Sequence, residues 1–218
     1  MVYNYSKIKI ILIYTRRDIK LNEINLDLFH ATDNKSARII LKEQKFIPGE
    51  DLDNEDFLGK GIYFFKEKEH AVMWNIKKAK EDKINYFNYK EYIINYAILK
   101  TNLLFKKNNF LDLDLPSKTA DYNKLCRKFE NIFGEDEEYK YAQHKDRAMI
   151  NYLYKNNLMD GIYIIKKIFS NRVKTSEFNI TKSIEREVYC VKDDRIIRSI
   201  EIMPNIEKNT YNSIKLIC

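Results

Sequence analysis

The chain of 218 residues is 44% hydrophobic and 33% charged, with a formal net charge of +7. This balance is typical of a globular protein that buries a core within one domain, and no apolar run reaches the roughly 20 residues of a membrane helix. Its three cysteines form no CxxC pair, which argues against a disulfide scaffold or structural zinc and favours a reducing compartment.

The first apolar run, IKIILIYT at residues 8–15, is predicted to be a strand rather than a secretory leader. No small-residue cleavage site follows it, and it continues into two arginines. We therefore expect a cytoplasmic protein without membrane association, folded as a single domain of residues 1–218. In this domain, residues 1–27 are an N-terminal strand or extension and residues 28–203 are the core.

Two helices are predicted around a strand that follows two glycines. The first helix lies in FHATDNKSARIILKEQKF (residues 29–46), where N-capping residue types precede apolar residues at helical spacing, and the proline and glycine of IPGED end it. The strand IYFF follows Gly59 and Gly61. The second helix lies in EKEHAVMWNIKKAKED (residues 67–82).

The rest of the chain mixes strands and helices. A strand is predicted in KEYIINYAILKTNLLF, and helices in SKTADYNKLCRKFENIF and AQHKDRAMINYLYKNNL. The short β-like runs are GIYIIKKI, REVYCV, RIIRSIEIM and YNSIKLI. Because these elements do not alternate as regular βαβ units, the predicted class is α+β with mainly antiparallel sheets.

Three polar residues at predicted strand positions stand out. His30 lies at a strand end, Tyr63 lies in the glycine-led strand, and Glu187 lies in a late strand. Each alone has an ordinary explanation as a surface or core residue. Strand alternation places Glu185 and Glu187 on one face and Arg186 on the other, and two acids held close together are costly unless a ligand uses them.

The order of HAT, GKGIYF and a late-strand glutamate closely resembles the ADP-ribosyltransferase superfamily. It looks most like the poly(ADP-ribose) polymerase branch with its His-Tyr-Glu triad, in a stand-alone bacterial or phage form. LMDGIYI (residues 158–164) is similar to the strand before the glutamate strand in bacterial members. The resemblance implies two packed, mainly antiparallel sheets that form an NAD cleft flanked by helices.

The resemblance also implies site residues, with NAD consumed as a co-substrate and no metal required. Glu187 would hydrogen-bond the nicotinamide ribose and stabilise the developing oxocarbenium ion. Tyr63 would stack on the nicotinamide ring, His30 would orient the adenosine ribose, and the Ala31 backbone would hold the nicotinamide amide. The residues implied to contact NAD are His30, Ala31, Thr32, Gly61, Tyr63, Ala71 and Trp74.

This chain departs from the family pattern at several of these positions. Ala31 stands where the family has glycine, and the serine that supports the amide falls near His70 and Ala71. The second aromatic falls near Met73 or Trp74, and Trp74 is the preferred choice. Glu185 precedes Glu187 as the first acid of a Glu-x-Glu pair, which in the toxin branch helps to present an acceptor.

The predicted function is NAD-dependent mono-ADP-ribosyl transfer to a macromolecular acceptor, protein or nucleic acid, in a toxin or effector setting with a cognate antitoxin or inhibitor. An NAD glycohydrolase that uses water as acceptor, and a non-catalytic NAD- or ADP-ribose-binding module, are the alternatives. The presence of all three triad residue types favours catalysis, because a binding module has no need of Glu187.

Overall fold

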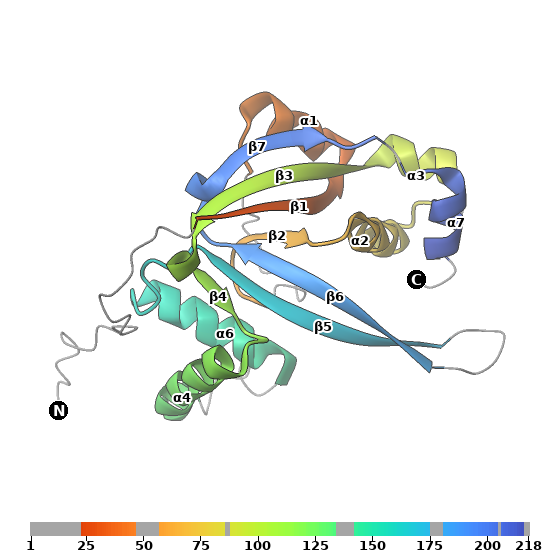
Figure 1. Ribbon diagram of the computed structural model, residues 1–218. Helices are drawn as coiled ribbons and strands as arrows, with labels where there is room; N and C mark the ends of the chain where they lie inside the picture. The colour runs from red at the N-terminus through yellow and green to blue at the C-terminus, as the bar shows by residue number, and fades with distance from the viewer. Residues whose placement is uncertain are drawn as a thin grey trace.

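Within the described residues, seven strands form one sheet with helices on both faces (Figure 1). The computed structural model describes residues 23–46, 57–85, 88–133, 142–174, 181–204 and 206–215. The strands are β1 (Glu23–Asp33), β2 (Ile62–Phe65), β3 (Tyr96–Lys106), β4 (Phe110–Asp112), β5 (Ile164–Lys174), β6 (Thr181–Val191) and β7 (Ile197–Ile202). The helices are α1 (Asn34–Glu43), α2 (Lys68–Glu81), α3 (Tyr89–Asn95), α4 (Pro116–Phe133), α6 (Ala142–Lys155) and α7 (Lys208–Lys215), and the 3-10 helices are η1 (Lys107–Asn109) and η2 (Asp194–Ile196). The predicted α+β class is confirmed.

Helix α1 begins as its sequence predicts, but it ends at Glu43, before the expected stop at IPGED, which lies outside the described residues. The backbone N–H of Ser36 donates to the Asp33 carboxylate at 2.8 Å, so Asp33 is the N-cap. At the other end, Gln44 adopts the left-handed conformation with φ of 49°, and its N–H donates to the Ile40 carbonyl. Ala37 and Ile40 are buried against the sheet.

Two segments predicted as strands are helical, and one lies outside the described residues. The run KEYIINY begins as helix α3, because the Asn88 side chain accepts from the Lys90 N–H and caps it, and strand β3 starts only at Tyr96. The run YNSIKLI begins inside helix α7, where Tyr211 and Ile214 lie three residues apart and are both buried. The predicted strand at residues 8–15 is not among the described residues.

The sheet is antiparallel except for the parallel pair β4–β5, and its strand order is β4-β5-β6-β2-β1-β3-β7. Strands β1 and β3 pair along their whole length, from Glu23 opposite Lys106 to Asp33 opposite Tyr96. Strands β1 and β2, in contrast, share only the register pair Phe29–Phe65 within the described residues. The expectation of two separate sheets is therefore wrong, because this short ladder joins the two halves into one sheet that is split at β1 and β2.

The two faces of the sheet carry different cores. The face that packs on α1, here called the α1 face, includes Leu28, Phe64 and Tyr189. The opposite face, here called the α2 face, packs Phe65 and Val188 against α2, and farther along the sheet it contacts α6. Figure 1 shows α2 in the fork between the β1–β3–β7 group and the β5–β6 hairpin.

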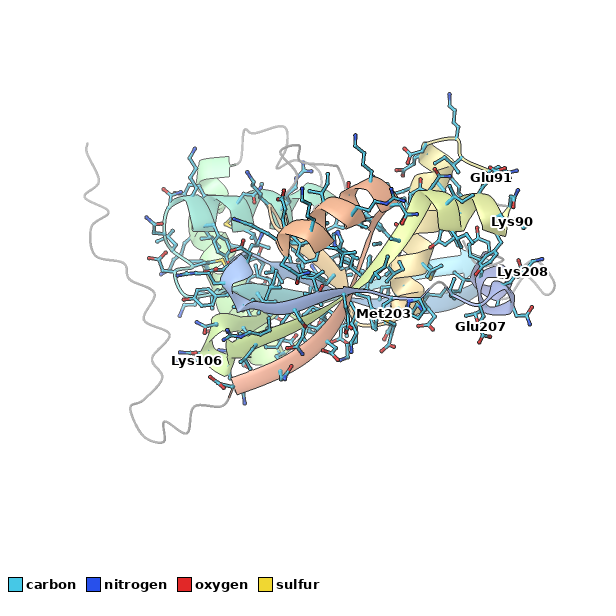
Figure 2. The ribbon with its side chains drawn as sticks, turned by 90° about the horizontal axis from the view of Figure 1, so that it is seen from above. Lys90, Glu91, Lys106, Met203, Glu207 and Lys208 are labelled. Carbon is cyan, nitrogen blue, oxygen red and sulfur yellow. The ribbon has the colours of Figure 1, made fainter. Side chains whose placement is uncertain are left out.

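A third region closes one end of the molecule. The Tyr211 ring of α7 lies 4.7 Å from the Tyr92 ring of α3, and both side chains belong to the core of the α2 face. Figure 2, seen from above, shows this end marked by Lys90 and Lys208, with Lys106 at the opposite end of β3.

No helix among the described segments has both the length and the apolar character needed to cross a bilayer.

Candidate functional site

His30 lies at the split between β1 and β2. Its Nδ1 atom is 2.8 Å from the Tyr63 carbonyl oxygen, and its ring packs edge-on against Phe46 at 4.9 Å and beside Phe64 at 5.5 Å. A carbonyl oxygen only accepts, so Nδ1 carries the hydrogen and donates it. Burial lowers the pKa of His30, and the bond to the Tyr63 carbonyl opposes this effect. The neutral ring therefore presents Nε2 as an acceptor.

Tyr63 is held by its own turn. Its hydroxyl donates to the Gly59 carbonyl at 2.7 Å and accepts from the Leu58 N–H at 2.9 Å. The ring lies on the α2 face, where it borders both core clusters of that face. The hydroxyl is therefore occupied by the turn, and the aromatic ring is what Tyr63 offers to a ligand.

Three other predicted NAD contacts gather on the same face as Tyr63. Ala31 and Trp74 border the core of the α2 face, and Ala71 is fully buried within it. The Trp74 ring lies 5.9 Å from the Phe65 ring, and the Nζ atoms of Lys77 and Lys78 lie 5.4 and 5.8 Å from its centre. These residues thus share one face of the sheet, in or beside the same core.

Thr32 belongs to a different surface. It is half-buried in β1, opposite Ala97 of β3, and strand alternation puts it on the face of His30. A cavity of about 630 Å³ opens just beyond it, beside the start of α1. Its lining includes Asp33, Lys35, Arg38 and Tyr96, but none of the predicted NAD contacts.

The two glycines of the GKGIYF string are required by contacts within the protein. Gly59 has φ of +74°, and a β-carbon there would collide with the Asn151 side chain. A β-carbon on Gly61 would collide with Cys190 Sγ and would lie 2.8 Å from the Val191 carbonyl oxygen. Packing against α6 and β6 therefore accounts for both glycines.

Glu187 and Glu185 share the α1 face, as the alternation in IERE predicts. Glu187 accepts from the Tyr189 hydroxyl at 2.5 Å, and Tyr189 belongs to the core of the α1 face. Burial and this bond to Glu187 raise the pKa of Tyr189, so its hydroxyl keeps its proton. Glu185 is exposed and lies opposite Ser170 of β5.

Lys166 joins Glu187 to two further acids. Its Nζ atom lies 3.2 Å from Asp112, 3.3 Å from Asp114 and 3.6 Å from Glu187. Burial lowers the pKa of Lys166, but the bonds to Asp112 and Asp114 and the charge of Glu187 outweigh it and raise the value. The Glu187 carboxylate is therefore held by one cation and one hydroxyl.

The structure does not bring the three predicted triad side chains to one face. Strands β1, β2 and β6 are consecutive in the sheet, and the Lys66 N–H donates to the Glu187 carbonyl oxygen at 3.1 Å. The side chains of His30 and Glu187 lie on the α1 face, whereas the Tyr63 ring lies on the α2 face. The predicted residues thus form two groups, separated by β2.

Arg186 takes the place on the α2 face where a triad glutamate was expected. It lies opposite Phe169 of β5, whose ring borders both cores of that face. After burial, the Arg186 charge is the next cause that lowers the pKa of His70, and it also contributes to the lowered pKa of Lys77. The strand alternation that pairs the two acids already implies this orientation, but no motif of the sequence marks Arg186.

Comparisons with known proteins add a distant relative. The chain is 24% identical over 199 residues to an uncharacterized protein of Methanocaldococcus jannaschii, and the match covers 83% of this chain and 88% of that protein. No family model matches the chain, and no solved structure matches it. The similarity spans most of both chains and assigns no activity to either.

Proposed function

We propose that the chain is an NAD-dependent mono-ADP-ribosyltransferase that binds NAD at the split between β1 and β2. The observation that carries the proposal is the contact of His30 with the Tyr63 carbonyl, which links the two motif strands across 33 residues of sequence. Ala31 and Trp74 border the core of the α2 face, as Tyr63 does, and Ala71 is buried within it. Their positions support a pocket for a flat aromatic ring.

In this proposal the chain recognises the two ends of NAD with different groups. The nicotinamide ring stacks between Tyr63 and Trp74, and the backbone at Ala31 bonds its amide. The neutral His30 ring accepts a hydrogen bond from the adenosine ribose through Nε2. Burial of His30 supports this role, because it keeps the ring uncharged at neutral pH.

The reaction breaks the bond between nicotinamide and ribose and forms a bond between the same ribose carbon and an acceptor. Nicotinamide leaves as a neutral molecule, and the acceptor gives up a proton. A carboxylate near the ribose stabilises the positive charge that develops in the transition state. The resemblance assigns this role to Glu187, whose carboxylate lies on the α1 face, across β2 from the Tyr63 ring.

One observation favours the second candidate, a non-catalytic module that binds NAD or ADP-ribose. On the face of Tyr63, strand β6 presents Arg186, and the Glu187 carboxylate is held on the other face by Tyr189 and Lys166. A cation beside the nicotinamide ribose opposes oxocarbenium formation, whereas it does not oppose binding of an anionic nucleotide.

The test follows NAD that carries a labelled adenylate in a cell lysate, with free nicotinamide and macromolecule-bound label measured together. Glu187→Gln removes the charge and keeps the shape, and Glu185→Gln is the matched control on the same face. For a transferase we expect the Glu187 variant to lose at least about 100-fold in both signals. The control is expected to keep nicotinamide release.

The other outcomes identify the alternatives. Nicotinamide release without bound label would identify a glycohydrolase. Binding of NAD or ADP-ribose by the wild type, with no release of nicotinamide, would leave the binding module and overturn the transferase proposal. The identity of the acceptor follows from whether protease or nuclease removes the label.

A further inference from the structure

Basic residues border the α2 face on the β6 side of Tyr63. Arg186 is half-buried on β6, and it lies close enough to His70 and Lys77 of α2 for its charge to contribute to the lowered pKa of each. Within the described residues, the Nδ1 atom of His70 is buried and has no hydrogen-bond partner. A buried ring nitrogen without a partner is costly, so a hydrogen-bonding group supplied at this position would be stabilising.

The strand order separates this region from the adenosine end of the proposed NAD site. His30 lies on β1, Tyr63 on β2 and Arg186 on β6. These strands are neighbours in the sheet, in the order β1-β2-β6. If the nicotinamide lies at Tyr63 and the adenosine ribose at His30, the dinucleotide extends from β2 toward β1. Arg186 then lies beyond the nicotinamide, outside the path of the dinucleotide.

We propose that Arg186, together with His70 and Lys77, binds a backbone phosphate of a single-stranded nucleic acid that serves as the acceptor. This inference rests on the proposed function. A guanidinium binds phosphate through two parallel hydrogen bonds, and the neighbouring Lys77 adds a second positive charge. The net charge of +7 attracts the same class of partner.

Trp74 lies beside two basic groups at the edge of the same surface. It is half-buried, and the Nζ atoms of Lys77 and Lys78 lie within 6 Å of its ring centre, at 5.4 and 5.8 Å. The Trp74 ring itself stacks on the nicotinamide in the proposed function, and the two lysines beside it add positive charge for contact with a nucleic-acid backbone.

The test measures binding of fluorescent single-stranded DNA and RNA oligonucleotides of about 12 nucleotides, titrated with the full chain at several salt concentrations. We expect Arg186→Ala to weaken binding about tenfold and to reduce the slope of log K against log salt by about 0.7. Arg186→Lys, which keeps the charge, is expected to restore most of the slope. Arg198→Ala is the matched control, because Arg198 is exposed on β7.

NAD binding, measured by calorimetry on the same variants, distinguishes the two phosphate sources. Unchanged NAD affinity with weakened oligonucleotide binding supports the proposal. Weakened NAD affinity with unchanged oligonucleotide binding would assign Arg186 to the diphosphate of the dinucleotide and overturn it. Equal oligonucleotide binding by wild type, Arg186→Ala and Arg198→Ala would overturn it as well.

The same measurements keep this inference separate from the proposed function. Nicotinamide release by the wild type tests the transferase, whatever the oligonucleotide result. Thermal unfolding of Arg186→Ala shows whether the variant is folded. If the alanine variant is not folded, oligonucleotide binding by Arg186→Lys is measured in its place. A folded lysine variant with wild-type salt dependence, beside an alanine variant with the reduced slope, is the expected pattern.

Discussion

The His30 ring donates through Nδ1 to the Tyr63 carbonyl oxygen at 2.8 Å and so bridges the split between β1 and β2. Backbone pairing between these strands is limited to Phe29 and Phe65 within the described residues, so a side chain supplements the ladder. The bond also sets the tautomer of the ring. One residue therefore joins the two halves of the sheet and presents an acceptor at their junction.

The stability of the protein is expected to depend on pH through His30. Its folded-state pKa lies below the ordinary value of 6.5 because burial disfavours the imidazolium. The unfolded chain thus binds a proton that the folded chain excludes, so this contribution is complete above pH 6.5 and is lost as the pH falls through the folded pKa.

His30→Asn keeps a nitrogen donor near the Tyr63 carbonyl and cannot titrate. Denaturant unfolding at about pH 7.5 and about pH 5 should therefore show a smaller loss of stability in the variant than in the wild type. The pKa of His70 is also lowered, but His70 is present in both proteins and cancels in the comparison. An equal loss of stability in the wild type and the variant would show that protonation of His30 does not destabilise the folded protein.

Tyr63→Phe should separate the hydroxyl of Tyr63 from its ring. The variant loses the bonds to the Leu58 N–H and the Gly59 carbonyl, so we expect a decrease of about 1–2 kcal/mol in the free energy of unfolding. The ring remains for stacking, so NAD affinity should stay within about threefold. Calorimetric titration with NAD checks this, with Tyr63→Ala as the variant that loses affinity.

Gly59→Ala and Gly161→Ala form a matched pair. Both glycines have positive φ, +74° and +85°, but a β-carbon would collide with Asn151 only at Gly59, and at Gly161 it meets nothing within 4 Å. The backbone conformation should cost about 1–2 kcal/mol at either position. We expect an additional loss at Gly59, measured by denaturant unfolding. Equal losses would show that the Asn151 side chain moves aside freely.

Lys166→Met should be more destabilising than Lys167→Met. Lys166 is only 13% exposed and forms ion pairs with Asp112, Asp114 and Glu187, so its removal leaves three carboxylates close together. We expect a loss of about 3 kcal/mol, as is found when one partner of a buried ion pair is removed. Lys167 is 32% exposed and pairs with Asp146, so its loss should be smaller. Thermal unfolding compares the two variants, and a smaller effect at Lys166 would contradict the role assigned to it.

Local sequence patterns were sufficient for most of the helices and for the class of the fold. Helix α1 carries its own cap in Asp33 and its own apolar stripe in Ala37 and Ile40, so it needed no tertiary information. The α7 segment was misassigned, because Tyr211 and Ile214 suit a strand as well as a helix. The segment is a helix because the helical spacing buries both side chains against α2 and α3.

In the candidate site, too, local sequence determined some features and tertiary structure decided the others. The sequence alone determined that His30, Tyr63 and Glu187 belong to strands, and that Glu185 and Glu187 share a face, because alternation is a local property of extended backbone. Only the tertiary structure decided how neighbouring strands are registered against each other. That register puts the Tyr63 ring on one face and the Glu187 carboxylate on the other, and it turns Arg186 toward α2. The glycines of GKGIYF belong to this second class as well, since the contacts that require them come from Asn151 and Cys190, both far away along the chain.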